Sequence, residues 1–222
     1  MRLPKLDERL QAAADLFTAC DLGADIGADH GRLSCYLLGM NRCKRMIVSD
    51  ISAPSLEKAR QLLALHALAD RADIRVSDGL DALNQKAGCA ALCGMGGRLM
   101  ADLLLRGKER LQGADLVLSC HTEITLVRRA VTEIGYHLCQ ERLTRAKGRY
   151  YIIMRAETGP CAYTEKELYL GPILMREKPA LWQDYLRWRR DVVSYEVGHE
   201  RQLAWIREEL NDEKAADGSE YI

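Results

Sequence analysis

Short apolar runs alternate with amphipathic stretches over the first 157 residues of the chain. The runs that predict β-strands are LGADIG, RMIVSD, ADIRVSDG, CAALCGM, ADLVLSC, HLCQERLTR and RYYIIMRAE. The segment RLQAAADLF, ahead of the first run, has helical periodicity, and so do residues 54–69 and 123–134. Ser52 and Pro54 fit the start of the helix at residues 54–69. This alternation is typical of a parallel α/β sheet.

The last two runs are joined only by AKG and predict a hairpin at the end of the sheet. A mixed, seven-stranded, Rossmann-like sheet with an antiparallel edge follows from this pattern. Dinucleotide-binding domains do not usually end in such a hairpin, whereas Rossmann-like methyltransferases do. The fold class predicted is therefore α/β, with a methyltransferase-type sheet over residues 1–157.

A second, helical and coiled-coil-like domain is predicted for residues 158–222, after a change of composition near Gly159-Pro160. Thr164 and Glu167 fit a capping box. Pro179 fits the first turn of a long helix that reaches about residue 210, although Gly198 is a point where it could divide. One apolar stripe is expected on it: Leu181, Tyr185, Trp188, Val192, Tyr195, His199, Leu203, Ile206 and Leu210. The stripe needs a partner, within the chain or in a homodimer.

Composition narrows the classes of protein. The chain has 222 residues, 48% of them hydrophobic, and a formal net charge of zero, which argues against disorder and against non-specific coating of nucleic acid. Its eight cysteines are irregularly spaced and no secretory leader is visible, so we expect reduced thiols in a cytoplasmic protein. Cys89 and Cys93 lack further ligands at zinc spacing, and no apolar run is long enough to span a membrane; neither a metal nor a membrane partner is expected.

Acidic residues follow successive strands of the predicted sheet. Asp25 and Asp29 lie in LGADIGADHG, Asp50 ends the second strand and Asp78 ends the third. Ligands of open parallel sheets bind beyond these carboxyl ends. A pyrophosphate would be repelled by an acidic first turn, whereas S-adenosylmethionine carries a cationic sulfonium and amino group and only one carboxylate.

The sequence therefore favours S-adenosylmethionine as cofactor over NAD. An acid in the position of Asp50 can accept hydrogen bonds from both ribose hydroxyls, and Asp78 with Gly79 would meet the adenine. The glycine-rich GMGG, Gly94 to Gly97, indicates close approach of backbone and ligand. Taken singly, Asp25 could instead cap a helix and Asp50 could cap the DISAP turn.

The motifs LGADIGADHG, SDGL, GMGG and LGPILMREKPALWQDYL resemble the TrmK family of bacterial tRNA (adenine-22-N1)-methyltransferases. The resemblance runs from Leu6 to about Trp188. It implies a catalytic domain that binds S-adenosylmethionine, a helical second domain and tRNA as partner. The chain departs from the family in SCHTE, Ser119 to Glu123, where a Gln-Pro pair is usual.

The resemblance also implies the site. The cofactor residues it predicts are Asp25, Gly27, Ala28, Gly31, Asp50, Ile51, Asp78, Gly79, Leu80, Cys93, Gly94, Met95, Gly96 and Gly97. Methylation at N1 makes the base cationic, so the catalytic residues expected are Asp29, whose carboxylate would stabilise that charge, and His30 beside it. Arg142, Arg145, Lys147 and Arg149 near the hairpin turn are expected to contact RNA phosphates.

Two other classes of function stay open on the sequence alone. One is an S-adenosylmethionine methyltransferase that acts on a small molecule or a protein. The other is a non-catalytic interaction protein that keeps the methyltransferase fold and uses its helices to bind a partner.

Overall fold

The computed structural model describes residues 3–195 and 198–210. It divides into two compact units, Met1–Ala162 and Tyr163–Ile222. The last strand of the first unit ends at Thr158, so the first unit extends slightly beyond the limit at residue 157 that the sequence predicted.

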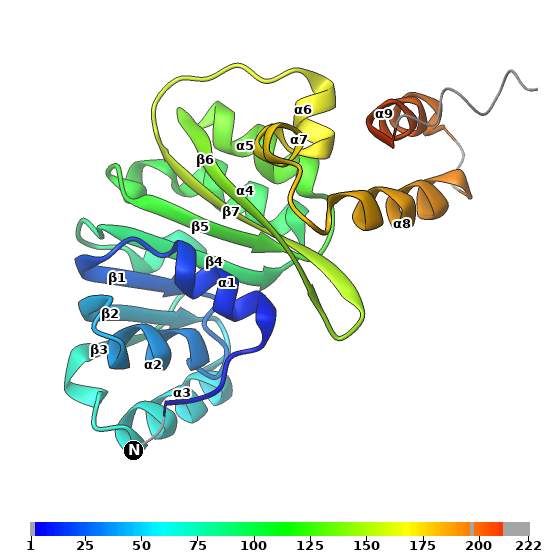
Figure 1. Ribbon diagram of the computed structural model, residues 1–222. Helices are drawn as coiled ribbons and strands as arrows, with labels where there is room; N and C mark the ends of the chain where they lie inside the picture. The colour runs from blue at the N-terminus through cyan, green and yellow to red at the C-terminus, as the bar shows by residue number, and fades with distance from the viewer. Residues whose placement is uncertain (1–2, 196–197, 211–222) are drawn as a thin grey trace, which may run out of the picture. The chain divides into compact units, whose positions relative to one another are not determined.

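A single seven-stranded sheet forms the centre of the first unit (Figure 1). Its strands are β1 (Cys20–Ile26), β2 (Cys43–Asp50), β3 (Ala72–Val76), β4 (Cys89–Met95), β5 (Asp115–Cys120), β6 (Tyr136–Ala146) and β7 (Arg149–Thr158). They are arranged in the order β3-β2-β1-β4-β5-β7-β6. The first five are parallel, and β7 pairs antiparallel with both β5 and β6. The predicted fold class and terminal hairpin are confirmed.

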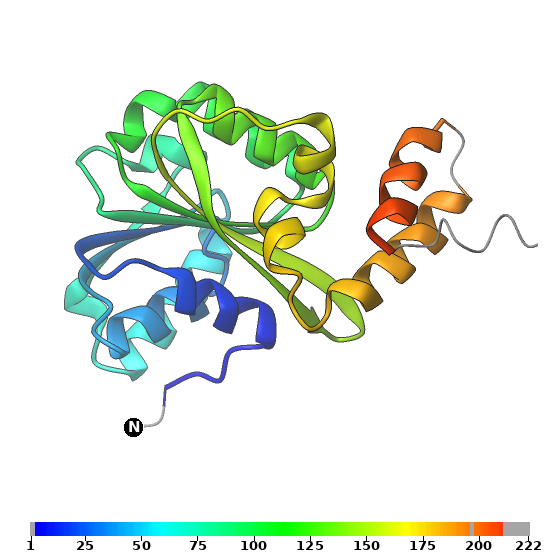
Figure 2. The same cartoon turned by 45° about the horizontal axis from the view of Figure 1, so that its top comes forward.

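Helices cover both faces of this sheet. The first layer contains α1 (Glu8–Leu16), α2 (Arg32–Gly39) and α3 (Ala53–Leu65), and the second contains α4 (Gly97–Leu111) and α5 (Ile124–Glu133). Short 3-10 turns lie at Ala69–Arg71 and Gly79–Ala82. Figure 2 shows the two helical layers on opposite sides of the strands. Strand order reverses between β1 and β4, and an open parallel sheet has its ligand crevice at such a point.

Local sequence explains where the helices next to this crevice begin. The Asp7 carboxylate accepts a hydrogen bond of 2.8 Å from Leu10 N and so caps α1. Ser52 caps α3 in the same way through Ser55 N, with Pro54 in the first turn, as predicted. Both caps fix helix starts at the carboxyl ends of the strands.

The second unit contains α6 (Glu165–Leu170), α7 (Pro172–Glu177), α8 (Trp182–Ser194) and α9 (Glu200–Leu210). The capping box of Thr164 and Glu167 is confirmed. Two helices, α8 and α9, take the place of one long helix, with Gly198 at φ +87° between them. Pro179 lies ahead of α8 rather than in its first turn, where its carbonyl accepts a hydrogen bond of 2.7 Å from Trp182 N.

The apolar stripe of the second unit also differs from the prediction. The buried side chains of α8 are Trp182, Tyr185, Leu186 and Val193. Trp188 and Tyr195, which the predicted stripe included, are exposed. The buried face of α8 instead contains Trp182, Leu186 and Val193, which the predicted stripe did not include. Within the chain, α8 packs against α9 and α9 against α6. The helices therefore find partners inside the second unit itself.

Candidate functional site

The loop after β1 is held in an unusual backbone conformation. Gly27 at φ +74°, Asp29 at φ +49° and Gly31 at φ +66° all adopt positive φ. A side chain on Gly31 would place its Cβ 2.7 Å from Ala59 Cβ, so α2 and α3 can approach only because this residue is glycine. Gly27 N and Ala28 N both donate to Ser49 O, at 2.8 and 2.9 Å, which fixes the loop against β2.

Asp50 joins this loop to the start of α3. Its Oδ2 accepts a hydrogen bond of 2.9 Å from Asp29 N, and its Oδ1 accepts one of 2.9 Å from Ser52 N. The predicted alternative, a capping role in the DISAP turn, is therefore present in the structure. Each carboxylate oxygen keeps a second lone pair, so the same group can still accept hydrogen bonds from a ligand.

Asp29 and His30 lie together on the α3 side of the loop. Asp29 Oδ1 is 3.1 Å from Ser55 Oγ and 3.4 Å from His30 Nε2. His30 Nε2 is also 3.3 Å from Lys58 Nζ. The side chain of Asp29 is 68% exposed to solvent, and that of His30 is 44% exposed. The structure thus places Asp29 beside Asp50 and the first turn of α3.

Asp25 is the buried acid of the site, with 2% of its surface exposed. Its Oδ2 accepts a hydrogen bond of 2.6 Å from Ser34 Oγ in α2. Burial raises the pKa of Asp25 from its ordinary 3.8 to about 6, partly offset by the hydrogen bonds from Ser34, while the charge of Asp50 raises it further. A carboxylate held in this way gains from a cationic neighbour.

A cavity of about 220 Å³ opens at the carboxyl ends of β1 and β4. Of the residues that the sequence predicted, it is lined by Asp25, Gly27, Ala28, Asp29, His30, Cys93 and Gly94. The lining residues that sequence reasoning missed are Arg9, Leu10, Arg32, Leu33 and His121. Gly31, Asp50 and Ile51 do not line this cavity. Asp50 nevertheless accepts a hydrogen bond from Asp29 N in the loop that lines it. Ile51 is 73% exposed.

The end of β3 faces a different cavity. Asp78, Leu80 and Arg106 are among the lining residues of this second hollow, of about 190 Å³. Asp78 Oδ2 is 2.8 Å from Arg106 Nη2 in α4. Gly79 has φ +54°, and a Cβ there would lie 2.2 Å from Leu103 Cδ2. The structure therefore does not bring Asp78, Gly79 and Leu80 into the cavity that contains Asp25.

The GMGG loop, Gly94 to Gly97, forms the junction of β4 and α4. Gly94 has φ +86°, and the pairing of β4 with β5 shifts register between Cys93 and Met95. At Gly97 a Cβ would lie 2.2 Å from Thr122 O, which forces a glycine there. Burial raises the pKa of the Cys93 thiol to about 12, so this residue lines the cavity as a neutral group.

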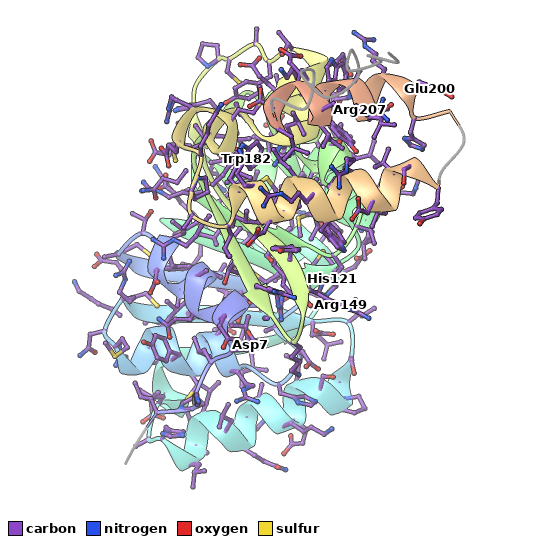
Figure 3. The ribbon with its side chains drawn as sticks, turned by 45° about the vertical axis from the view of Figure 1, so that its right-hand side comes forward. Asp7, His121, Arg149, Trp182, Glu200 and Arg207 are labelled. Carbon is purple, nitrogen blue, oxygen red and sulfur yellow. The ribbon has the colours of Figure 1, made fainter. Side chains whose placement is uncertain are left out.

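His121, which directly follows β5, stands beside Gly94 in the cavity wall. Its ring makes an edge contact with Tyr151, with 5.9 Å between centroids. Figure 3 shows His121 close to Arg149 at the turn end of the β6–β7 hairpin. Burial and the neighbouring charge of Arg9 hold the pKa of His121 below its ordinary value of 6.5, with a smaller contribution from Arg149. His121 belongs to the segment SCHTE, Ser119 to Glu123, so this segment contributes a side chain to the cavity wall.

The basic residues of the hairpin have different surroundings. Arg142 Nη1 is 2.7 Å from Asp15 Oδ2 of α1. The guanidinium of Arg145 lies over the ring of Tyr150, at 5.4 Å from its centroid. Lys147 occupies the turn with φ +49°. Arg142 thus has an acidic partner within the unit, which Arg149 lacks among the residues that the structure describes.

All eight cysteines are free thiols. Among residues 3–195 and 198–210, no group of three His, Cys, Asp or Glu side chains is placed to hold a metal ion. None of the helices in those ranges is long and apolar enough to cross a membrane.

Comparison with known proteins gives consistent results. The family model TrmK, tRNA (adenine(22)-N(1))-methyltransferase, matches residues 23–216. The tRNA (adenine(22)-N(1))-methyltransferase of Bacillus subtilis is 30% identical over 186 residues, which cover 80% of this chain and 78% of that protein.

Solved structures match the fold over nearly the whole chain. A Streptococcus pneumoniae protein in complex with S-adenosyl-L-methionine aligns with a TM-score of 0.86 and 21% identity, covering 93% of this chain and 100% of that one. M. capricolum TrmK in complex with S-adenosyl-homocysteine aligns with a TM-score of 0.77 and 19% identity, covering 95% and 96%. By the extent of the family match and by its identity to the B. subtilis enzyme, this chain belongs to the TrmK family of tRNA (adenine(22)-N(1))-methyltransferases.

Proposed function

We propose that this chain transfers the methyl group of S-adenosylmethionine to N1 of adenine 22 in tRNA. Family membership supports the reaction, and relatives of the same fold have been determined with S-adenosyl-L-methionine and S-adenosyl-homocysteine. The observation that carries the proposal is Asp25, a buried carboxylate with a raised pKa in the wall of a cavity beside a left-handed glycine turn. Such a group suits a cationic ligand and disfavours a pyrophosphate.

The residues present fit this cofactor. When bound, S-adenosylmethionine supplies an electrophilic methyl group on a positively charged sulfur. Asp25 would face its positive charge, and Asp50 would accept the ribose hydroxyls with its remaining lone pairs. Gly27 and Gly94 allow the backbone to come close, because neither carries a side chain into the cavity.

The remaining predicted cofactor residues stay proposals. Ile51 is exposed directly after Asp50, where an apolar surface could meet the adenine ring. Gly31, Met95, Gly96 and Gly97 would act by shaping the loops around the cavity. A role for Asp78, Gly79 and Leu80 at the adenine requires that the ligand extend to the second hollow, where Asp78 is already paired with Arg106.

For the substrate, the chain must present an unpaired adenine to the methyl group. N1 has a free lone pair, so alignment contributes more than a strong base does. N1 also lies on the pairing edge of the base, so adenine 22 must be unstacked or flipped out. We propose that Arg145, Lys147 and Arg149 contact the RNA backbone near the hairpin turn, with Arg142 contributing less because Asp15 already binds it.

Asp29→Asn tests the catalytic role proposed for Asp29. Because the methylated base is cationic, we expect loss of the carboxylate to lower kcat about tenfold while the Kd for S-adenosylmethionine changes little. Single-turnover rates and calorimetry measure the two quantities separately. Ser55→Ala is the matched control, since it removes only the hydroxyl that contacts Asp29. A variant with unchanged kcat and a tenfold higher Kd would instead make Asp29 a ribose-side residue.

The function itself is tested with labelled S-adenosylmethionine and two tRNA transcripts that differ only at position 22. We expect 1-methyladenosine in the transcript with adenine 22 and none in the transcript with guanine 22. Mapping of the labelled nucleotide completes the test. Equal labelling of both transcripts would refute adenine 22 as the methylated position. If the chain binds the cofactor but labels neither transcript, another methyl acceptor is favoured.

A further inference from the structure

His121, directly after β5, lines the same cavity as Asp25 and Gly94 and was not assigned to the site from the sequence. We infer that a ring nitrogen of His121 accepts a hydrogen bond from the exocyclic amino group of the adenine that is methylated. The inference rests on the proposed function. It adds a residue of this chain that selects adenine among the purine bases and orients its N1.

His121 lies where an incoming base can reach it. The residue is exposed, whereas Asp25, in the wall of the same cavity, has 2% of its surface exposed. In Figure 3 His121 stands close to Arg149 at the turn end of the β6–β7 hairpin, whose basic residues are proposed to contact the RNA backbone. A base of RNA bound there enters the cavity on the side of His121.

The ring of His121 is held in place by its neighbours. It makes an edge contact with Tyr151 of β7, with 5.9 Å between centroids. Its backbone nitrogen donates to Met95 O at 3.0 Å, which ties the residue to the end of β4. A Cβ added to Gly94 would lie 3.9 Å from His121 Nε2, so the ring stands beside the GMGG loop. The imidazole is therefore positioned before a base binds.

The surroundings of the ring favour a neutral imidazole with one acceptor nitrogen. Partial burial and then the charge of Arg9 lower the pKa of His121, the hydrogen-bonding backbone of Gly94 raises it, and Arg149 lowers it slightly. A backbone group that raises this pKa is an acceptor, so the Gly94 carbonyl faces a ring N–H. The other nitrogen of a neutral ring is then an acceptor. No side chain of the described residues donates a hydrogen bond to it.

Methyl transfer strengthens the hydrogen bond that this nitrogen would accept. The lone pair of N1 forms a bond to the methyl carbon, and the electrons of the broken carbon–sulfur bond pass to the sulfur. The base becomes cationic, and the charge spreads onto its amino group, which becomes a better donor. A neutral acceptor on that group thus stabilises the transition state more than the substrate.

Adenine is the purine base that fits such an acceptor. Its amino group adjoins N1, so one hydrogen bond to this group also aims the N1 lone pair. Guanine has an oxygen in place of the amino group and a proton on N1, so it offers an acceptor where His121 needs a donor. A mismatch of this kind leaves polar groups unpaired in the site, which disfavours the wrong base.

The test compares tRNA transcripts with adenine or with unsubstituted purine at position 22, since purine keeps N1 and lacks the amino group. Single-turnover methyl transfer is measured at saturating tRNA for the unmodified chain and for His121→Phe, which keeps a ring against Tyr151 but no ring nitrogen. We expect His121→Phe to lower the rate about 10- to 100-fold on adenine and less than about twofold on purine. His121→Asn supplies an amide oxygen and should recover part of the loss on adenine.

His66→Phe is the matched control, because His66 ends α3 and does not line the cavity. An unchanged Kd for S-adenosylmethionine verifies that each variant is folded. Equal losses on both acceptors would make His121 a packing residue and overturn the inference, as would full activity of His121→Phe on adenine. If the unmodified chain binds the cofactor but does not methylate adenine 22, the proposed function fails and the inference fails with it, so the two failures are distinguishable.

Discussion

Glu141→Leu is expected to lower the free energy of unfolding of the first unit by about 3–5 kcal/mol. Glu141 in β6 and Arg128 in α5 have no exposed side-chain surface, and Glu141 Oε1 lies 2.9 Å from Arg128 Nε and 2.8 Å from Arg128 Nη2. Removing the carboxylate alone leaves the guanidinium buried without it. Most of the loss comes from this desolvated charge rather than from the leucine.

Replacing both partners separates these contributions. In the double variant Arg128→Met with Glu141→Leu, apolar side chains replace both charged groups of the pair, so we expect stability within about 1 kcal/mol of the unmodified chain. Arg98→Ala, which breaks an exposed pair with Glu123, serves as control and should change stability by less than about 1 kcal/mol.

The probe for this experiment has to report on the first unit. All three tryptophans, Trp182, Trp188 and Trp205, lie in the second unit, so their fluorescence would follow the wrong part of the chain. Urea unfolding can be monitored by the circular dichroism signal of the β-sheet. Hydrogen exchange of the β6 and β7 amides gives a second probe of the first unit. A loss below about 1 kcal/mol for Glu141→Leu would contradict the expected effect.

The sheet was predictable because its strands carry their own signal. The strands β2, β4 and β5 each contain a short apolar run, and β6 and β7 are joined by a tight turn. The division between α8 and α9 was visible only as one glycine, Gly198. Because the pattern is helical on both sides of Gly198, the sequence alone could not show whether one helix runs through this residue or two helices meet there.

The site was predicted in part. The β1 loop is contiguous in sequence, so Asp25, Gly27 and Asp29 could be assigned together. Arg9 and His121 were missed because their proximity arises from packing of α1 and β5 around Gly94, between residues far apart in the chain. Their only local signals were a cation in the first turn of a helix and a histidine directly after a strand. The pairing of Asp78 with Arg106 of α4 escaped prediction for the same reason, since the two residues are 28 positions apart in the chain.

Asp25 gives the second large effect, a dependence of stability on pH. Its pKa is about 6 in the folded chain and 3.8 ordinarily, so the folded state holds this proton more tightly than the unfolded state does. Stability from this group is therefore complete below about pH 4 and is lost as pH rises through about 6. A shift of about two pKa units corresponds to about 3 kcal/mol.

Asp25→Asn removes the titration. We compare the unfolding free energy of Asp25→Asn with that of the unmodified chain, both without cofactor. Between pH 4 and pH 8, we expect the variant to gain up to about 3 kcal/mol of stability relative to the unmodified chain. Comparing the two pH values cancels the cost of burying the asparagine amide. Asp21→Asn, on the same strand but exposed, is the control and should show little change. A difference that does not depend on pH would mean that Asp25 has an ordinary pKa.

The same substitution is expected to weaken S-adenosylmethionine about 10- to 100-fold at pH 8, because the cationic ligand loses the carboxylate that it stabilises. Binding to the unmodified chain near pH 6 should then release a proton, measurable by calorimetry in buffers of different ionisation enthalpy, and binding to Asp25→Asn should release less. The acid thus destabilises the empty fold at neutral pH and is compensated by the ligand. If Asp25→Asn gained stability and kept full affinity for S-adenosylmethionine, Asp25 would not interact with the cofactor. Its burial would then have no functional reason.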